Sequence, residues 1–83
     1  MKDTMTQLLE LLYNSDEGEY KKNSRFEKIK SEEGDFHKVG DQGVILGSLI
    51  VKEEDMDDEL YLVKFDNDPK HNTIIIKQKI KLI

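Results

Sequence analysis

Residues 37–47 read HKVGDQGVILG, and the rest of the fold can be worked out from this stretch. Gly40 and Gly43 lie three residues apart, directly before an apolar run over residues 44–51. Glycine readily adopts the positive φ angles that tight turns require, so the pair predicts a turn that leads into a strand. The run is nearly all apolar, as in a strand covered on both faces, and Gly47 predicts a bend or bulge within it.

A second strand is predicted over residues 60–65, where side chains alternate between two faces. One face carries Tyr61, Val63 and Phe65. The links on either side, residues 52–59 and 66–72, are rich in Asp, Asn and other turn formers. Both links are short enough for antiparallel hairpins.

The last strand is predicted over residues 73–83, with one buried and one solvent-facing side. Its apolar side chains share a face with Gln78, and three lysines alternate with them. The apolar members are Ile74, Ile76, Ile80 and Leu82, and the lysines are Lys77, Lys79 and Lys81.

An amphipathic helix is predicted over residues 1–14, because Met5, Leu8, Leu9 and Leu12 have the spacing of one helix face. Residues 15–23 are strongly polar and predict a flexible linker. Residues 24–31, SRFEKIKS, fit either a helical turn or the first strand of a barrel. We favour the strand, because the segment leads into the glycine-punctuated β region.

The runs KVGDQGVILG, YLVKFDND and TIIIKQKIKLI together resemble SH3-like small barrels, including the KOW-type barrels of bacteria. Gly40 and Gly43 carry most of this resemblance, with Tyr61, Val63 and Phe65. It implies a mainly β fold, a small antiparallel barrel over residues 24–83. Barrels of this kind bind RNA, bind peptides, or serve in enzyme subunits and phage particles, so the resemblance names no function.

Length and composition narrow the possible functions. A chain of 83 residues makes one domain, and without Cys it has no disulfide, thiolate nucleophile or Cys-type zinc site. No signal sequence and no membrane-spanning run is visible, so we expect a cytoplasmic protein of bacterial or phage type that does not bind a membrane. The net charge of −5 disfavours non-specific binding to nucleic acid and suits a basic protein partner.

The clearest candidate for a binding site is a run of acidic residues between the first two predicted strands. A hard cation or a basic protein surface could bind there, but the run lacks the spacing and the glycine of a calcium-binding loop. It could also be only a solvated hairpin tip. The acidic residues are Glu53, Glu54, Asp55, Asp57, Asp58 and Glu59.

A second candidate is the stripe formed by Lys77, Lys79 and Lys81, which could follow a nucleic-acid backbone. No aromatic residue interleaves with it to stack bases. Lysines also protect edge strands against pairing with other chains. Nucleic acid is therefore the alternative partner rather than the leading one.

No motif predicts catalysis. Gly40 to Gly43 lacks the pattern of a phosphate-binding loop. His37 and His71 lack metal-ligand spacing, and no serine lies in a nucleophile elbow. We therefore expect a non-catalytic protein without cofactor that binds another protein, in the manner of an inhibitor, an immunity protein or a small phage protein.

Overall fold

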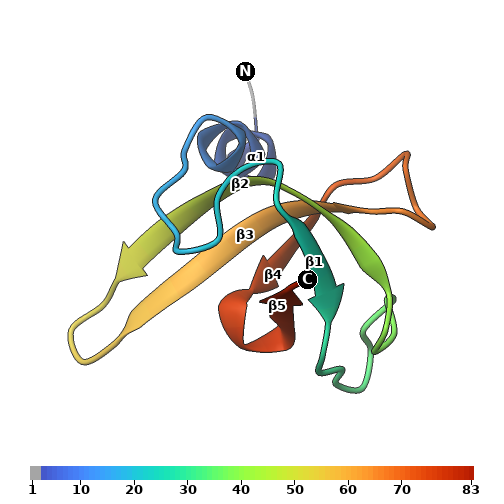
Figure 1. The fold of residues 1–83 in the computed structure, drawn as a ribbon. Coiled ribbons are helices and arrows are strands. Elements are labelled where there is room, and N and C mark those ends of the chain that lie inside the picture. Colours follow the sequence, from blue (N-terminus) through green and yellow to red (C-terminus); the bar gives the residue numbers. More distant parts are fainter. Residues whose placement is uncertain (1–2) are drawn as a thin grey trace.

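The chain forms one curled antiparallel sheet of five strands, preceded by an α-helix (Figure 1). The computed structural model describes residues 3–83, and in it the helix α1 spans Thr4–Tyr13. The strands are β1 (Arg25–Lys28), β2 (Gln42–Lys52), β3 (Asp57–Phe65), β4 (Thr73–Ile76) and β5 (Ile80–Leu82), and the 3-10 turn η1 (Lys77–Lys79) joins the last two. The mainly β fold with an N-terminal helix is confirmed.

The strands follow the order β4-β3-β2-β1-β5 across the sheet, and all neighbours are antiparallel. The last strand returns to the first, with Phe26 opposite Leu82, and this pairing curls the sheet around its inner face. Within residues 3–83, β4 and β5 remain the two ends of the sheet and do not pair with each other. The sheet is therefore barrel-like but not closed.

The inner face of the curled sheet holds the main core. Tyr61, Val63 and Phe65 all point into it, as the alternation in the sequence predicts. Phe26 packs edge-to-face on Phe65, with ring centroids 5.1 Å apart. The remaining members are Ile45, Ile75 and Ile80.

The three glycines of residues 37–47 have three different structural roles. Gly40 has a φ of +97°, which confirms the predicted turn, whereas Gly43 is already in β2, packed against the Lys64 backbone and the Phe26 ring. The β2–β3 register shifts between Ile45 and Gly47, which confirms the predicted bulge. A side chain at Gly47 would overlap the carbonyl oxygen at the end of α1, so this glycine lets the helix rest on β2.

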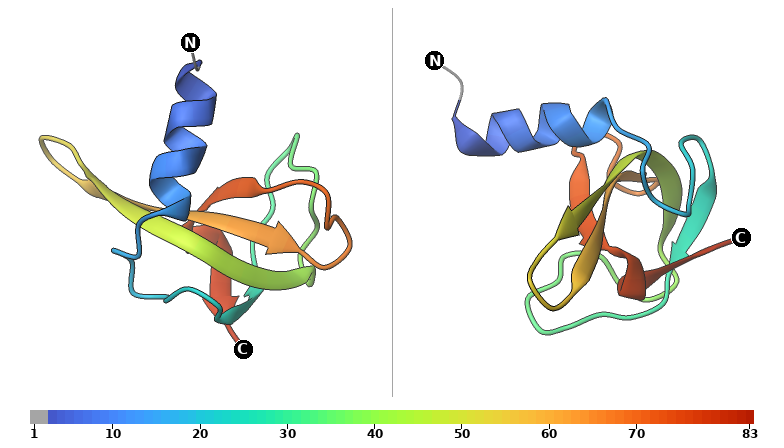
Figure 2. Two further views of the ribbon diagram at one scale, coloured as in Figure 1. Left: turned by 90° about the horizontal axis from the view of Figure 1, so that it is seen from above. Right: turned by 90° about the vertical axis from the view of Figure 1, so that its left-hand side faces the viewer.

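The helix touches the sheet only near its C-terminal end and extends outward from it (Figure 2). Asp3 caps its start, accepting a hydrogen bond from the Thr6 N–H at 2.7 Å. Of the predicted apolar face, Leu12 is fully buried, whereas Met5 is largely exposed. Packing therefore anchors the last turn of α1 and leaves its first turns accessible.

Residues 15–23, which we expected to form a flexible polar linker, lie along β2 and are hydrogen-bonded to it. The Ser48 N–H donates to the Ser15 carbonyl at 3.0 Å, and the Glu17 N–H donates to the Ser48 carbonyl at 3.3 Å. The Gly18 N–H donates to the Ser48 hydroxyl at 2.8 Å. Farther along, the Asn23 N–H donates to the Ile45 carbonyl at 2.8 Å. These bonds continue along the edge of β2 that pairs with β1, in the stretch that β1 is too short to reach.

The prediction of one continuous strand over residues 73–83 is wrong. The turn η1 separates β4 from β5, and the two strands lie at opposite ends of the sheet. Ile75 and Ile80 are buried, whereas Ile76 and Leu82 are exposed, so the predicted apolar face is only partly correct. The physical reason is that β5 pairs with β1, and a straight strand leaving β3 cannot reach it.

Candidate functional site

The β2–β3 hairpin extends past the other strands as an arm, which Figures 1 and 2 show in yellow-green and yellow. We call residues 52–59 the acidic arm. Lys52 is opposite Asp57 at the last pair of the ladder, and the Glu53 N–H donates to the Met56 carbonyl at 2.9 Å. The Met56 side chain is 61% exposed at the tip. The arm thus combines an ordered backbone with an accessible end.

Most carboxylates of the acidic arm have no internal partner. Within residues 3–83, the structure gives no hydrogen bond or ion pair to five of its side chains, although acidic side chains elsewhere usually have one. The five are Glu53, Glu54, Asp55, Asp57 and Asp58. Like charges so close together repel one another, so a cationic partner would lower the electrostatic energy of the arm.

Glu59, the sixth predicted acidic residue, belongs to the fold instead. Its carboxylate accepts a hydrogen bond from the Tyr61 hydroxyl and another from the Glu19 N–H at 3.2 Å. The Tyr20 N–H donates to the Tyr61 hydroxyl oxygen at 3.0 Å, and the two tyrosine rings stack. Burial and the Glu59 carboxylate hold the pKa of Tyr61 above its ordinary value. Glu59 is therefore not one of the acidic side chains of the arm that are available to bind a partner protein.

The predicted lysine stripe does not form on one continuous strand, because η1 interrupts it. Lys77 Nζ lies 3.2 Å from a Glu19 carboxylate oxygen and 5.3 Å from the centre of the Tyr20 ring. Lys79 Nζ lies 2.9 Å from Asp35, and Lys81 Nζ lies 3.9 Å from Glu27. Hydrogen bonds to these carboxylates raise the pKa of Lys77 and of Lys79. The lysine charges are thus offset locally by acidic neighbours.

A cleft of about 380 Å³ lies between β4 and the loop of residues 29–41. All four residues of β4 line it on one side. Phe36 and His37 line it from the loop, and Asp68 of the β3–β4 turn lines it as well. The cleft was not predicted, because the loop is so polar that its sequence gives no apolar pattern.

Buried charges hold this loop in place. Lys28 is only 3% exposed, and its ammonium donates to Asp35 at 3.1 Å and to the His37 carbonyl at 2.6 Å. Asp35 also accepts from the Glu32 N–H at 3.0 Å and from Lys79 at 2.9 Å. These bonds, that of Glu32 foremost, hold the pKa of Asp35 far below its usual range. The loop therefore has a defined shape at neutral pH.

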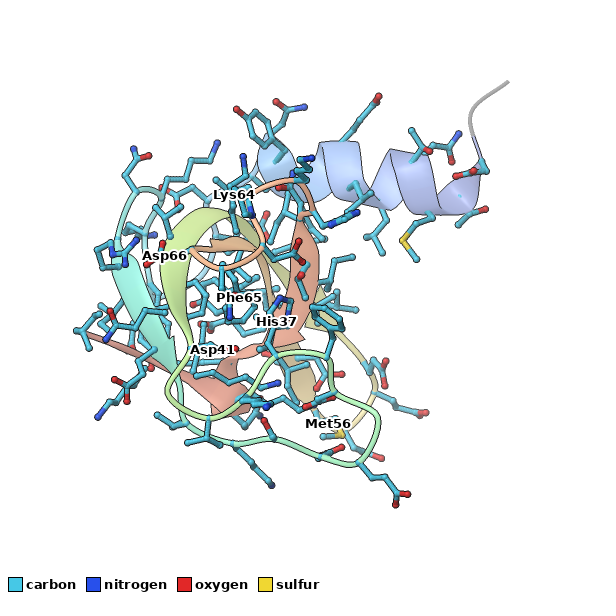
Figure 3. All side chains as sticks on the ribbon, turned by 90° about the vertical axis from the view of Figure 1, so that its right-hand side faces the viewer. His37, Asp41, Met56, Lys64, Phe65 and Asp66 are labelled. Atoms are coloured by element: carbon cyan, nitrogen blue, oxygen red, sulfur yellow. The ribbon has the colours of Figure 1, made fainter. Side chains whose placement is uncertain are left out.

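His37 closes the open end of the core. Figure 3 shows it beside Phe65, and the two rings stack with centroids 3.7 Å apart. Its Nε2 lies 3.4 Å from an Asp68 carboxylate oxygen but has no hydrogen-bond partner within residues 3–83. Asp68 is itself 2.8 Å from His71 Nδ1, and this hydrogen bond lowers the pKa of Asp68. Both histidines thus meet one carboxylate at the β3–β4 turn.

Over residues 3–83 no group of three or more histidine and acidic side chains is arranged to hold a metal ion. No helix in the same range is long and apolar enough to cross a membrane. Comparison with known protein families, curated proteins and solved structures gave no match. The acidic arm and the cleft are therefore the two candidate binding features of the described residues.

Proposed function

We propose that this chain is a non-catalytic interaction protein that binds a basic surface of another protein through the acidic arm. The observation that carries the proposal is a group of five carboxylates, at the end of a projecting hairpin, that have no partner among residues 3–83. Glu59 and the three C-terminal lysines are already engaged inside the molecule, and most of the free negative charge of residues 3–83 lies on the arm. Such a concentration attracts cationic surfaces over distances near the Debye length.

The exposed Met56 adds an apolar contact to the charged tip. Interfaces combine an apolar centre with polar and charged groups around it, and Met is enriched there. One concrete form of the function is a small inhibitor or immunity-type protein that covers a basic region of an enzyme.

We also propose that the fold is an SH3-like barrel. The return of β5 to β1 supports this, because a final strand that meets the first is what curls such a sheet towards closure. The long turn before β2, with Gly40 at positive φ, supports it as well. Non-catalytic binding is one of several uses of such barrels, so the fold adds no function of its own.

The test begins with a tagged pull-down from cells of the source organism, in which retained protein and nucleic acid are both quantified. Binding of the captured protein is then compared between the wild type and a variant that carries E53Q, E54Q, D55N, D57N and D58N. We expect the variant to bind more slowly and more weakly, because charge complementarity speeds association.

The matched control is Glu33→Gln, which neutralises an exposed carboxylate in the loop, outside the acidic arm. It should leave binding close to that of the wild type. Equal binding by the five-site variant would show that the acidic arm only confers solubility. Retention of RNA or DNA without a protein partner would replace this proposal with nucleic-acid binding at Lys77, Lys79 and Lys81.

A further inference from the structure

The cleft beside β4 runs along an open edge of the sheet. β4 pairs with β3 on one side and is the last strand of the order on the other. Successive side chains of a strand point to opposite faces, so a cleft on one face would meet every second residue. The cleft instead meets all four consecutive residues of Thr73–Ile76. This pattern places it along the strand's free edge.

The hydrogen bonds of β2 show which backbone groups of β4 point into the cleft. Ile45 uses its N–H and its carbonyl towards the β1 side, with Ser24 and Asn23. The residue opposite it on β3, Val63, therefore turns its own N–H and carbonyl away from β2 and towards Thr73 of β4.

The same relation holds at the next position. Ser48 bonds to Ser15 and Glu17, so Tyr61, which is opposite Ser48, points towards Ile75. Thr73 and Ile75 are consequently the residues that bond to β3. By alternation, the N–H and carbonyl groups of Ile74 and Ile76 face the open edge. Within residues 3–83 the structure gives no hydrogen bond to the N–H and carbonyl of Ile74 or to the N–H of Ile76. The Ile76 carbonyl, at the start of η1, instead accepts the first hydrogen bond of that turn.

The opposite wall of the cleft is preformed. Lys28, Asp35 and Lys79 fix the loop of residues 29–41 through hydrogen bonds of 2.6–3.2 Å. The Phe36 side chain of the loop is 82% exposed, whereas His37 is buried and its Nε2 has no hydrogen-bond partner within residues 3–83. A wall that is already ordered costs little additional entropy when a ligand binds.

We propose that this cleft accepts an extended segment of the partner protein, which adds as a strand to the free edge of β4 beneath Phe36. Addition of a strand satisfies both main-chain groups of Ile74 and the N–H of Ile76 through main-chain hydrogen bonds. At ~3.3 Å per residue the four residues of β4 offer an edge for a segment of similar length. This inference rests on the proposed function and names a second contact for the same partner.

The charges of the cleft point to a basic segment. Three carboxylates, of Glu32, Asp35 and Asp68, line it with two ammonium groups, of Lys28 and Lys79. The excess of negative charge favours Lys or Arg in the added strand, with an apolar residue against Phe36. A second copy of this chain fits less well, because each copy has a net charge of −5.

The test uses a synthetic six-residue peptide of alternating valine and lysine, with blocked ends. Binding is followed by chemical-shift changes of the ¹⁵N-labelled full-length protein. We expect changes in β4 and in the loop of residues 29–41. Two control peptides are used: one with methylated backbone nitrogens, which cannot pair as a strand, and one with glutamate in place of lysine. Both should bind at least about tenfold more weakly, as the loss of one or two hydrogen bonds or ion pairs implies.

The matched protein variants are Ile76→Pro and Ile76→Val. Ile76 has a φ of −82°, close to the value that proline fixes, and its N–H faces away from β3, so the proline variant should fold. The proline variant lacks the outward N–H donor, and its affinity for the peptide should be about tenfold lower than that of the wild type. The valine variant keeps the donor and should bind within about fourfold of the wild type, since it lacks only one methylene.

Several results would overturn the inference. The valine–lysine peptide could fail to bind at all. The N-methylated peptide could bind as tightly as the unmodified one, or the unmodified peptide could bind Ile76→Pro as tightly as it binds the wild type. Shift changes confined to the acidic arm would also overturn it, yet would leave the proposed function in place. Concentration-dependent dimerisation that Ile76→Pro abolishes would make a second copy of the chain the occupant of the edge. Failure of the five-site variant to weaken partner binding concerns the proposed function alone.

Discussion

At the scale of single residues, Asp35 is the centre of the loop that forms one wall of the cleft. Its carboxylate meets two ammonium groups and a backbone N–H, and Lys28 is almost completely buried. Replacing Asp35 with Asn leaves the buried Lys28 ammonium without its charged partner. A buried charge that loses its partner is strongly destabilising. We therefore expect Asp35→Asn to lower the free energy of unfolding at neutral pH.

The stabilising contribution of the Asp35 carboxylate should decrease as the pH falls. The pKa of Asp35 is lower in the folded than in the unfolded chain, chiefly because of the hydrogen bond from Glu32 and then those from Lys79 and Lys28. Its contribution is present above the unfolded pKa of about 3.9 and is lost as the pH falls through the lower folded pKa. Urea unfolding of the wild type and of Asp35→Asn should thus differ at pH 7 and converge in strong acid.

The neighbouring Glu33→Gln serves as the control, since this carboxylate is exposed. It should unfold like the wild type across the same pH range. A constant difference between wild type and Asp35→Asn from pH 7 down to the most acidic condition would contradict the ionic role of Asp35.

The burial of charged and polar residues in and next to this loop could not be predicted from the sequence. Lys28 and His37 are buried, although they occur in a stretch dominated by charged residues that predicts exposure. Lysine is buried in proteins only when a partner compensates its charge, and that partner is identified by spatial proximity alone. Gly40, by contrast, was predictable, because positive φ is a local property of the chain.

At the scale of elements, α1 is attached to the sheet by its last turn. Leu12 is fully buried against β2, and the adjacent Leu11 is 51% exposed. Leu12→Ala should lower the free energy of unfolding by about 2–5 kcal/mol, because it leaves a cavity under the helix. Leu11→Ala, the same change one residue earlier, should cost less than about 0.5 kcal/mol. Urea denaturation of both variants measures the contrast, and equal effects would show that the helix is not anchored as described.

The C-terminal segment shows where periodicity misleads. Ile74, Ile76 and Ile80 follow the period of a strand, yet three residues of 3-10 turn intervene. Nothing in Lys77–Lys79 is a turn former, so the local sequence carries no signal for η1. The turn exists because β5 must reach β1, and such long-range pairing overrides local propensity. The hairpin formed by β2 and β3 was predictable, because both strands and their link are contiguous in the chain.

The break at η1 also changes the expectation for nucleic acid. Lys77, Lys79 and Lys81 each face a different carboxylate, so together they do not present a continuous basic stripe. We expect no retention of single-stranded DNA or RNA at about 50 mM salt, where binding to phosphates is strong. Filter binding with a labelled oligonucleotide measures this directly. Tight binding that falls with salt and is lost on Lys→Ala changes at the three sites would support the nucleic-acid alternative.

At the scale of the whole molecule, most of the carboxylates without a partner among residues 3–83 lie together on the acidic arm, whereas unpaired lysines such as Lys30, Lys64 and Lys70 lie elsewhere. Ion pairs join the body of the protein across several elements, as between Arg25 and Asp66 or between Lys79 and Asp35. The five carboxylates of the acidic arm that lack partners lie at one extremity. A net charge of −5 is thus presented unevenly, and such a distribution orients an approaching cationic surface before contact.

The clustering of unpaired carboxylates on the acidic arm predicts how the rate constants for binding the captured partner depend on salt. The association rate constant should fall steeply as NaCl rises, while the dissociation rate constant changes much less, because steering acts on the encounter. The five-site variant should associate slowly at every salt concentration, with a nearly flat dependence. Ile76→Pro should show the opposite behaviour: unchanged association and faster dissociation, since short-range hydrogen bonds act after contact. Stopped-flow measurements over a salt series give the association and dissociation rate constants separately. If both variants changed the same rate constant in the same way, the arm and the β4 edge would not act as separate contacts.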